Sequence, residues 1–434
     1  MFERTRWWAR RILAYRPKVK LDIDLEESQW WPLERLRAYQ DKHLRRLVRY
    51  AWRRVPAYRR KFDEAQVKPG QIRSARDLAL LPLAQRAEMQ DNADFVNSRR
   101  IFTTLYTGGS TGMPLRYYEC AWSSAMRWAA HERGWLWNGY EYGKRLAVIA
   151  ARQGAVLKEN TLTLDGDLGP ENLKETIQRL FDFKPQHLRG YVGSLYVLAR
   201  GLLAGGKKLK GVESVNPISE NLYDFQRAVM EEAFGAPVFE EYCCNDGGAC
   251  AWECKAHTGL HLFLERSIVE SLEGAIVTTE LGNTAMPFIR YVNGDLIEFL
   301  DKECPCGRPL PLVRVKGREN DMIITPYKAV GATYLMYHGA EYDSADFRSG
   351  IHEVQYAQHP GYRLVASVVR NEWFSEEEAE AFERKLRQIL PGMEIEIRYV
   401  EAIETTLAGK RRFIANHDEA LLRQWKNGTV EFLK

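Results

Sequence analysis

The sequence YTGGSTGMPLRYY, residues 106–118, contains a run of small and polar residues from 107 to 114 that cannot build a hydrophobic core. Its backbone N–H groups, together with the hydroxyls of Thr107, Ser110 and Thr111, can instead hold phosphate oxygens. It is not a Walker loop, because no Gly-Lys-Ser/Thr follows. A flexible hairpin turn is the structural alternative, since Gly/Ser/Thr clusters commonly form turns. LRYYE (115–119) has strand character, so the loop is expected to join two strands.

The segments on either side of this loop predict an α/β protein. Before it, Leu44, Leu47, Val48 and Ala51 recur at helical spacing, and the first hundred residues are expected to be largely helical. After it, short apolar strands alternate with helices as far as residue 242, which favours a layered domain with much parallel sheet. From residue 258 to residue 299 the sequence is rich in β-strand patterns, which are separated by glycines.

The length of 434 residues suits two or three domains. We place a domain boundary close to residues 317–321. The predicted domains are therefore 1–320, with a helical lead-in over 1–100, and 321–434. In the second domain, FSEEEAEAFERKLRQIL (374–390) reads as an amphipathic helix capped by Ser375 and stopped by Pro391-Gly392.

Composition excludes several classes of protein. A net charge of +4, set against 62 basic and 58 acidic residues, gives no general case for nucleic-acid binding. No apolar run is long enough for a membrane span. The cationic N-terminal segment is read as a docking helix, with a membrane-surface helix as the alternative, and its arginines argue against a signal peptide. Seven cysteines, six of them between 243 and 306, do not resemble a secreted disulfide scaffold, so the cytoplasm is the expected location.

Three further motifs carry candidate binding residues. In VFEEYCCNDGG (238–248), Tyr242 can stack on a base, and Asp246, at a strand end, can hold Mg²⁺ on a nucleotide phosphate. In MPFIRYVNGDLIEF (286–299), Asp295 can accept both ribose hydroxyls. In KGREND (316–321), Arg318 lies at the expected domain junction. Ordinary turn chemistry is the alternative for the first two of these motifs.

A separate pattern suggests a zinc site with no open position for catalysis. Cys254, Cys304 and Cys306, completed by either His257 or His261, would supply a tetrahedral set of ligands. His257 has knuckle spacing from Cys254, so the sequence leaves the choice of histidine open. The alternative is a group of buried free cysteines beside a surface histidine.

Together these motifs resemble the adenylate-forming superfamily of acyl-CoA synthetases. TGGSTGMP, EYCCND, MPFIRYVNGD, KGREND and TTLAGKRR occur in the superfamily's order. YAWRRVPAYR (50–59), TTELGNTAMPFIRYVNGD (278–295) and CPCGR (304–308) are similar to blocks of its phenylacetate–CoA ligase and CapK-like branch. Members of this branch carry a structural zinc in the region of the cysteines, and His261 matches the branch's histidine position.

The resemblance implies a large N-terminal adenylate-forming domain of layered sheets and helices, and a small, mobile α+β C-terminal domain. It implies ATP and Mg²⁺ as cofactors, with coenzyme A as a further candidate. Lys410, in AGKRR, would reach the α-phosphate and the carboxylate. The other nucleotide contacts that it implies are Thr107, Gly108, Gly109, Ser110, Thr111, Gly112, Ser219, Glu220, Tyr242, Asn245, Asp295 and Arg318.

The chain departs from the family in one block. The family has Tyr-Gly-x-Thr-Glu where this chain has Tyr242-Cys-Cys-Asn-Asp246. Asp246 keeps the charge with a shorter reach toward Mg²⁺, Asn245 replaces a hydroxyl that helps to bind the acyl-adenylate, and Cys243 replaces a glycine. Asn320 also stands where an acidic hinge residue is common.

The predicted function is ATP-dependent, AMP-forming ligation of a carboxylic acid. Coenzyme A is the expected acceptor, with an amine, a hydroxyl or a carrier-protein thiol as alternatives. Aromatic residues over 135–140 and at Tyr191 would suit a flat or hydrophobic acid, although they can equally be core. The alternative function is a catalytically altered nucleotide-binding relative that acts as a scaffold in a polysaccharide or natural-product pathway. A homodimer is an open possibility for the oligomeric state.

Overall fold

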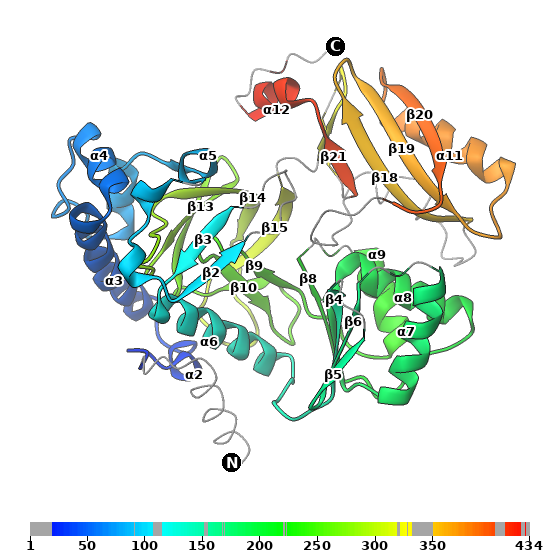
Figure 1. Cartoon of the computed structure of the whole chain (residues 1–434), viewed down its shortest axis with the longest axis horizontal. Helices are drawn as coiled ribbons and strands as arrows, with labels where there is room; N and C mark the ends of the chain where they lie inside the picture. Colours follow the sequence, from blue (N-terminus) through cyan, green and yellow to red (C-terminus); the bar gives the residue numbers. More distant parts are fainter. Residues whose placement is uncertain are drawn as a thin grey trace. The chain divides into compact units, whose positions relative to one another are not determined.

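The structure is a computed structural model of the whole chain (Figure 1). It describes residues 20–434 except 91, 107–114, 152–154, 167, 169, 220, 221, 223, 319–321, 328, 332–349, 404–412, 427–429 and 431–434. The chain divides into two compact units. The first comprises Met1–Leu146, Glu213–Ser219 and Pro237–Lys316, and the second comprises Ala147–Val212, Glu220–Ala236 and Gly317–Lys434.

This division agrees with the predicted domains at one point only. The last segment of the second unit begins at Gly317, where the sequence suggests a boundary. The second unit also contains residues 147–212 and 220–236, which the sequence analysis assigns to the large domain. The domain limits 1–320 and 321–434 therefore stay a prediction.

The first unit begins with helices, as predicted. The long helix α3 (Leu33–Arg54) buries Leu44, Leu47, Val48 and Ala51, the residues that indicate the helix in the sequence. It ends at Val55, which is extended because a residue before proline avoids the helical conformation. The shorter elements are α2 (Leu25–Ser28), α4 (Pro56–Glu64), η1 (Ala75–Leu80), α5 (Arg86–Met89), η2 (Ala93–Phe95) and η3 (Ser98–Arg100).

The centre of the first unit is an eight-stranded sheet. Seven strands follow the order β12-β13-β14-β15-β11-β10-β9, and β1 pairs with β14. Their bounds are β1 (Ala84–Gln85), β9 (Glu241–Cys243), β10 (Cys250–Glu253), β11 (Leu260–Leu262), β12 (Ser267–Leu272), β13 (Ala275–Glu280), β14 (Tyr291–Leu300) and β15 (Leu312–Arg318).

This sheet is largely antiparallel, and all of its strands except β1 lie in residues 241–318. The expectation of much parallel sheet concerns the alternating segment that ends at residue 242, and it stays a prediction. The pairs β9–β10, β10–β11, β11–β15, β12–β13 and β13–β14 are antiparallel, and β1 is parallel to β14. The physical reason is the short connections, because parallel neighbours need a long crossover. Between β12 and β13, for example, only Glu273 and Gly274 form the turn, and both have positive φ, as a tight hairpin requires.

A helix and a hairpin lie against this sheet. The strands β2 (Thr103–Tyr106) and β3 (Arg116–Glu119) pair antiparallel, so the glycine loop between them joins two strands as predicted. The loop itself lies outside the described residues. Helix α6 (Ala121–Trp137) follows and packs on β10 (Figure 1). It comes very close at Gly134, where a Cβ would lie 2.1 Å from the Trp252 ring.

The second unit contains the strand–helix alternation that the sequence predicts. Its strands follow the order β5-β6-β4-β7. Their bounds, with those of the helices among them, are β4 (Leu146–Ala151), β5 (Val156–Lys158), β6 (Thr161–Asp165), α7 (Pro170–Phe183), β7 (His187–Tyr191), α8 (Val192–Ala204) and α9 (Asp224–Phe234). The strand β8 (Ser214–Ile218) belongs to the first unit, where Val215 forms a parallel bridge with Val238.

The C-terminal part of the second unit is a four-stranded sheet with one long helix. The strand order is β20-β19-β18-β21, with bounds β18 (Ile351–His359), β19 (Arg363–Arg370), β20 (Glu394–Val400) and β21 (Ile414–Asn416). Helix α11 (Glu376–Ile389) confirms the predicted amphipathic helix, and the Ser375 hydroxyl caps it by accepting the Glu378 N–H at 3.2 Å. Elsewhere, β16 (Met322–Ile324) pairs with β17 (Ala329–Gly331), and α12 (Glu419–Lys426) follows β21.

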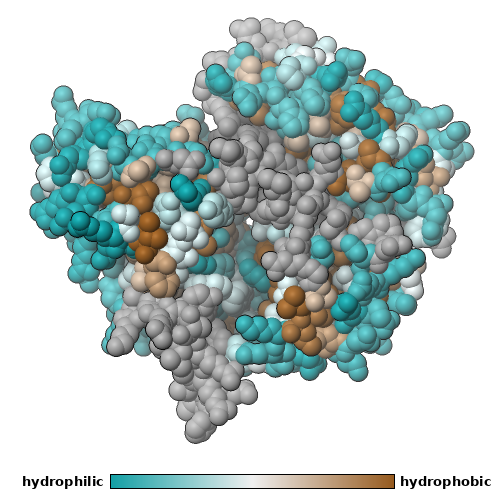
Figure 2. Space-filling view, viewed as in Figure 1, coloured by the Kyte–Doolittle hydropathy of each residue, from teal (hydrophilic) through white to brown (hydrophobic). Residues whose placement is uncertain are grey.

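The visible surface is mostly hydrophilic, with separate hydrophobic areas on each unit (Figure 2). Among the described residues, no helix has both the length and the apolar character needed to cross a membrane.

Candidate functional site

Several predicted site residues cannot be compared with the structure. Residues Thr107, Gly108, Gly109, Ser110, Thr111, Gly112, Glu220 and Lys410 lie outside the described residues. Arg318 is the last residue of β15, and its side chain is not described. Ser219 is exposed just after β8 and has a positive φ of 69°. The residues discussed below all belong to the first unit.

The structure brings together the residues predicted to hold the adenine and the ribose. The Tyr242 hydroxyl donates a 2.7 Å hydrogen bond to Asp295 Oδ2. Asn293 completes the group, because its amide donates to the Tyr242 oxygen at 2.9 Å and its carbonyl oxygen accepts the Asp295 N–H at 3.0 Å. Tyr242 comes from β9 and Asp295 from β14, so the sheet joins two motifs that are 53 residues apart. The carboxylate beside Tyr242 is thus fixed in place.

Asp246 lies in a turn that is built for close packing. Gly247 and Gly248, which follow it, have φ of 89° and 77°. A Cβ on Gly247 would come within 2.3 Å of Thr278 Cγ2, so only glycine fits there. The Thr278 hydroxyl donates to the Gly247 carbonyl at 2.7 Å and anchors the turn to β13.

The carboxyl group of Asp246, the predicted magnesium ligand, lies in a buried and hydrogen-bonded environment. Its side chain is buried, and burial raises the pKa of the carboxyl group. Oδ2 accepts a 2.9 Å hydrogen bond from the Tyr291 hydroxyl, and Oδ1 accepts one from the Cys244 thiol at 3.2 Å. Mg²⁺ requires near-octahedral oxygen ligands and usually keeps several waters. In this arrangement the carboxylate holds the turn, and its role as a direct magnesium ligand stays a prediction.

Four predicted zinc ligands converge. The ligand atoms of Cys254, His261, Cys304 and Cys306 all lie within 4.8 Å of one another. The Cys254 and Cys304 sulfurs are 3.5 Å apart, and the Cys306 sulfur lies 3.4 Å from His261 Nε2. Burial lowers the pKa of His261 to about 4, so the imidazole is neutral at pH 7 and can act as a ligand. Three thiols and one imidazole are a donor set that fits tetrahedral Zn²⁺.

The structure also separates the two candidate histidines. His257 is not a member of this cluster. Its Nδ1 lies 3.1 Å from Glu253 Oε1, and its ring stacks on Phe239 at 4.9 Å between centroids. His261 lies on β11 opposite Trp252 of β10, which turns its side chain into the core beside the cysteines. The geometry therefore selects His261.

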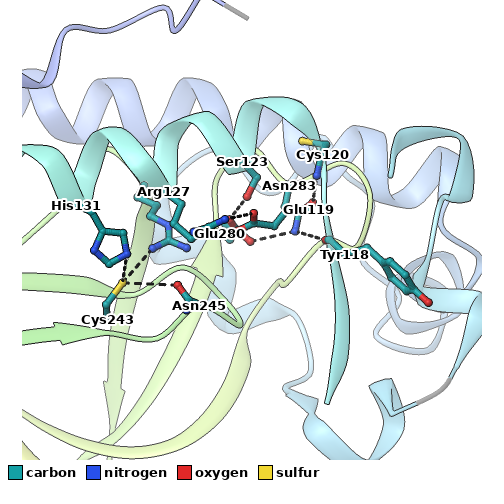
Figure 3. Close-up of polar contacts among 11 residues, drawn as sticks. Tyr118, Glu119, Cys120, Ser123, Arg127, His131, Cys243, Asn245, Glu280 and Asn283 are labelled. Atoms are coloured by element: carbon teal, nitrogen blue, oxygen red, sulfur yellow. Dashed lines mark hydrogen bonds and ion pairs between the residues drawn. The ribbon is translucent and has the colours of Figure 1, made fainter. Parts of the chain in front are cut away.

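Sequence reasoning missed a buried polar network beside the same sheet. Ser123, Arg127 and His131 follow one another at four-residue spacing along α6, and their side chains point toward the strands (Figure 3). Arg127 forms a double hydrogen bond with Glu119, at 2.8 and 3.0 Å. The Ser123 hydroxyl donates to Glu280 of β13. The sequence signal was the i, i+4 and i+8 spacing of these three polar residues in one helix.

Glu280 and Asn283 extend this network from the strands. Asn283 donates to Glu280 at 3.2 Å and to the Tyr118 carbonyl at 2.9 Å, so it ties β3 to the loop after β13. Burial raises the pKa of Glu280 to about 7. Two acidic groups and two guanidinium groups, those of Glu119, Glu280, Arg127 and Arg266, thus lie in or beside one buried network.

Known proteins are similar to this chain in sequence and in fold. No family model matches the chain. A phenylacetate–coenzyme A ligase of Thermus thermophilus is 26% identical over 335 residues, which is 69% of this chain and 74% of that protein. Protein CapK of Staphylococcus aureus is 23% identical over 366 residues, or 78% of this chain and 80% of CapK. The chain is similar to these proteins over two thirds or more of its length.

Solved structures agree on the fold. A 2-hydroxyisobutyryl-CoA ligase in its postadenylation state, in complex with 2-HIB-AMP, matches with a TM-score of 0.73 at 19% identity. The match covers 95% of this chain and 98% of that one. These findings confirm the predicted resemblance to phenylacetate–CoA ligases and to CapK, and the predicted α/β fold class.

Proposed function

We propose that the chain is an ATP-dependent, AMP-forming ligase that activates a carboxylic acid as its acyl-adenylate. The observation that carries the proposal is the contact between Tyr242 and Asp295 at 2.7 Å. The residues expected to stack on adenine and to bind the ribose meet in one place, within a fold shared with an acyl-adenylate-bound CoA ligase. Tyr242 is only partly buried, which is compatible with its predicted stacking on a base.

The chemistry requires positive charge and oriented donors. Carboxylate attack on the α-phosphorus brings two anions together, so the charge that develops in the transition state must be offset. In this proposal Lys410 supplies that charge, and Thr107–Gly112 hold the departing pyrophosphate. Arg318, Ser219 and Glu220 contribute further contacts to the ribose, a phosphate and the adenine edge. A lysine on a mobile segment would also permit release after the first half-reaction.

Magnesium enters with the nucleotide. Mg²⁺ is commonly held by substrate phosphates and water with few protein ligands, and it would neutralise the phosphate charge. Asp246 as its direct ligand, and Asn245 as a contact of the acyl-adenylate, stay predictions.

Coenzyme A is the proposed acceptor, because the relatives include coenzyme A ligases. A carrier protein, an amine and a hydroxyl are the alternatives. The acid is proposed to be aromatic or hydrophobic, since Trp135 and Tyr140 pack edge to face with ring centroids 5.8 Å apart near the His131 ring. A location in the cytoplasm and a homodimer stay predictions.

We further propose that Cys254, His261, Cys304 and Cys306 hold a structural zinc ion. A four-ligand site leaves no open position for substrate, so this zinc would stabilise the fold without taking part in the chemistry. It would tie β10 and β11 to the loop before β15.

The test is pyrophosphate release with ATP, Mg²⁺ and a panel of aromatic and aliphatic acids that includes phenylacetic and 2-hydroxyisobutyric acid. Lys410→Ala should slow adenylation by on the order of 10²–10³, because it removes charge stabilisation in the transition state. Arg412→Ala is the matched control, since it removes the same charge two residues away. Wild-type release that Lys410→Ala leaves unchanged would refute the role of Lys410.

A non-catalytic nucleotide-binding relative is the second candidate. The buried Asp246, with both carboxylate oxygens already accepting hydrogen bonds, favours it. ATP binding by calorimetry without pyrophosphate release for any acid in the panel would establish this second function and overturn the first.

A further inference from the structure

Cys243 is a residue that the proposed ligase chemistry does not use. It ends β9, directly after the proposed adenine contact Tyr242, and its sulfur faces helix α6 (Figure 3). His131 Nε2 lies 3.6 Å from the sulfur, and Arg266 Nη1 lies 3.5 Å from it. A thiol between an imidazole and a guanidinium is the arrangement that favours the thiolate.

Arg266 indicates that an anion belongs at this position. It is 1% exposed, and its Nε and Nη2 have no hydrogen-bond partner among the described residues. A buried cation is costly unless a negative charge compensates it. The sulfur of Cys243 accepts from the remaining nitrogen, so a thiolate there would supply the compensating charge.

The neighbouring strand supports the same assignment. Cys250 is the cross-strand partner of Cys243, and its thiol donates to the Cys243 sulfur. That hydrogen bond, with smaller contributions from His131 and Arg266, lowers the pKa of Cys243 despite the opposing effect of burial. Burial, followed by the hydrogen bond to Cys243, raises the pKa of Cys250, so the proton stays on Cys250.

Acidic groups also face this cluster. Glu280 and Glu119 both interact with Arg266, and Glu119 already pairs with Arg127. Because burial raises the pKa of Glu280 to about 7, this carboxyl group is only partly ionised near neutral pH. It therefore neutralises only part of the positive charge of Arg266. Arg266 therefore retains charge for the sulfur.

Cys243 lies beside a residue that is predicted to contact the acyl-adenylate. Cys243 is partly exposed. Asn245, the predicted contact of the acyl-adenylate, is exposed, and its Oδ1 lies 3.9 Å from the Cys243 sulfur (Figure 3). The thiol and the predicted adenylate contact thus lie side by side. Cys243 does not belong to the metal-type cluster found among the described residues.

We propose that Cys243 is a nucleophile that takes the acyl group from the adenylate as an enzyme-bound thioester and then passes it to the final acceptor. This inference rests on the proposed ligase function. The thiolate sulfur attacks the carbonyl carbon, the S–C bond forms, the C–O bond to the phosphate breaks, and AMP leaves with the electron pair. As the thiolate forms, the thiol proton passes to His131 Nε2, 3.6 Å away. In the second transfer the acceptor attacks the thioester and loses its proton to solvent, the C–S bond breaks, and the sulfur leaves with the electron pair as the regenerated thiolate.

The first experiment looks for the thioester by intact-protein mass spectrometry and peptide mapping. In one arm the full-length protein receives phenylacetic acid, ATP and Mg²⁺, and pyrophosphate is measured in parallel. In the other arm it receives preformed phenylacetyl-adenylate without ATP. We expect one acyl group on Cys243, removable by neutral hydroxylamine as a thioester is. Cys243→Ser should lose this adduct, and Cys120→Ser, a buried cysteine elsewhere in the unit, should keep it.

The two arms separate the two proposals. Pyrophosphate release without an adduct in either arm overturns the thioester and leaves the ligase function standing. An adduct from the preformed adenylate alone supports the thioester and counts against adenylation of this acid. Neither pyrophosphate nor adduct overturns the thioester and counts against adenylation of this acid. Acylation that maps to lysines, or that survives hydroxylamine, also counts against Cys243.

A second measurement tests the nucleophile without any acid. An ordinary thiol reacts with iodoacetamide about tenfold faster for each pH unit gained below its pKa of about 8.5. Cys243 should react at a rate that changes little between pH 7 and 9, and His131→Gln should restore much of the ordinary slope. A Cys243 rate that rises tenfold per unit in the wild type would refute the thiolate, and with it the proposal.

Discussion

Two groups of cysteines in the same antiparallel sheet are surrounded by different partners. Around Cys254, three sulfurs and an imidazole converge within 4.8 Å. Around Cys243, one sulfur meets an imidazole at 3.6 Å and a buried guanidinium at 3.5 Å. In the first group the positive charge that would stabilise a thiolate must come from a metal ion. In the second group the protein's own side chains supply it. The neighbours of a cysteine, rather than its burial, decide its chemistry.

The largest expected effect separates the two histidines of the zinc proposal. His261→Ala should lose the bound zinc and more than about 3 kcal/mol of stability, because the metal's binding energy contributes to folding. That loss corresponds to a fall in Tm of roughly 6–12 °C. His257→Ala is the matched control and should keep the metal. Zinc content by mass spectrometry and Tm by calorimetry are the measurements, and equal zinc content in the two variants would contradict the assignment.

The next effect concerns Cys243 itself. Cys243→Ser should keep the full zinc content and lose only about 1–2 kcal/mol of stability, since a hydroxyl can still hydrogen-bond to Arg266. The rapid alkylation at pH 7 should vanish. Zinc loss in this variant would mean that the two clusters are not independent, which metal analysis and iodoacetamide labelling together would reveal.

A smaller effect is expected for His131→Gln. The amide keeps a polar group beside the sulfur but cannot take its proton, so the thiolate fraction should fall. Alkylation of Cys243 at pH 7 should slow by about tenfold, toward the rate of an ordinary thiol, of which only a few per cent is thiolate at this pH. An unchanged rate would show that Arg266 and Cys250 suffice without the imidazole.

The smallest effect is on the pH dependence of stability. Burial raises the pKa of Glu280 to about 7, whereas in the unfolded chain it is 4.5. The folded protein therefore keeps this proton between pH 4.5 and 7 while the unfolded chain loses it, so stability falls as the pH rises through that window. Glu280→Gln should reduce this loss of unfolding free energy between pH 5 and 8 by on the order of 1–3 kcal/mol. Denaturant unfolding at both pH values measures this, and parallel wild-type and variant curves would contradict it.

Much of this architecture could be predicted from the sequence. The helical spacing in residues 44–51, the cap at Ser375 and the strands on either side of the glycine loop are local signals, and the structure confirms them. The antiparallel order of the large sheet could not be read in this way, because strand pairing depends on connections across the whole domain.

The candidate site was predictable only where residue type and spacing coincide. The cysteines and His261 were identified, but the choice between His257 and His261 needed the register of β10 and β11. The cluster around Cys243 was missed because its three members, on α6, on β9 and just before β12, are 112 and 23 residues apart. No local pattern brings such residues together.

Gly134 is the residue at which α6 approaches β10 most intimately, three positions after His131. Because Gly134 has no side chain, the Trp252 ring can lie against the helix backbone. The distance between α6 and β10 in turn affects the distance between the His131 ring and the Cys243 sulfur. The glycine thus allows the closest approach of the helix to the strand. Each added methyl group would lift the helix and lengthen the path of a proton from sulfur to nitrogen, so a packing residue could tune the reactivity of a thiol that it never touches.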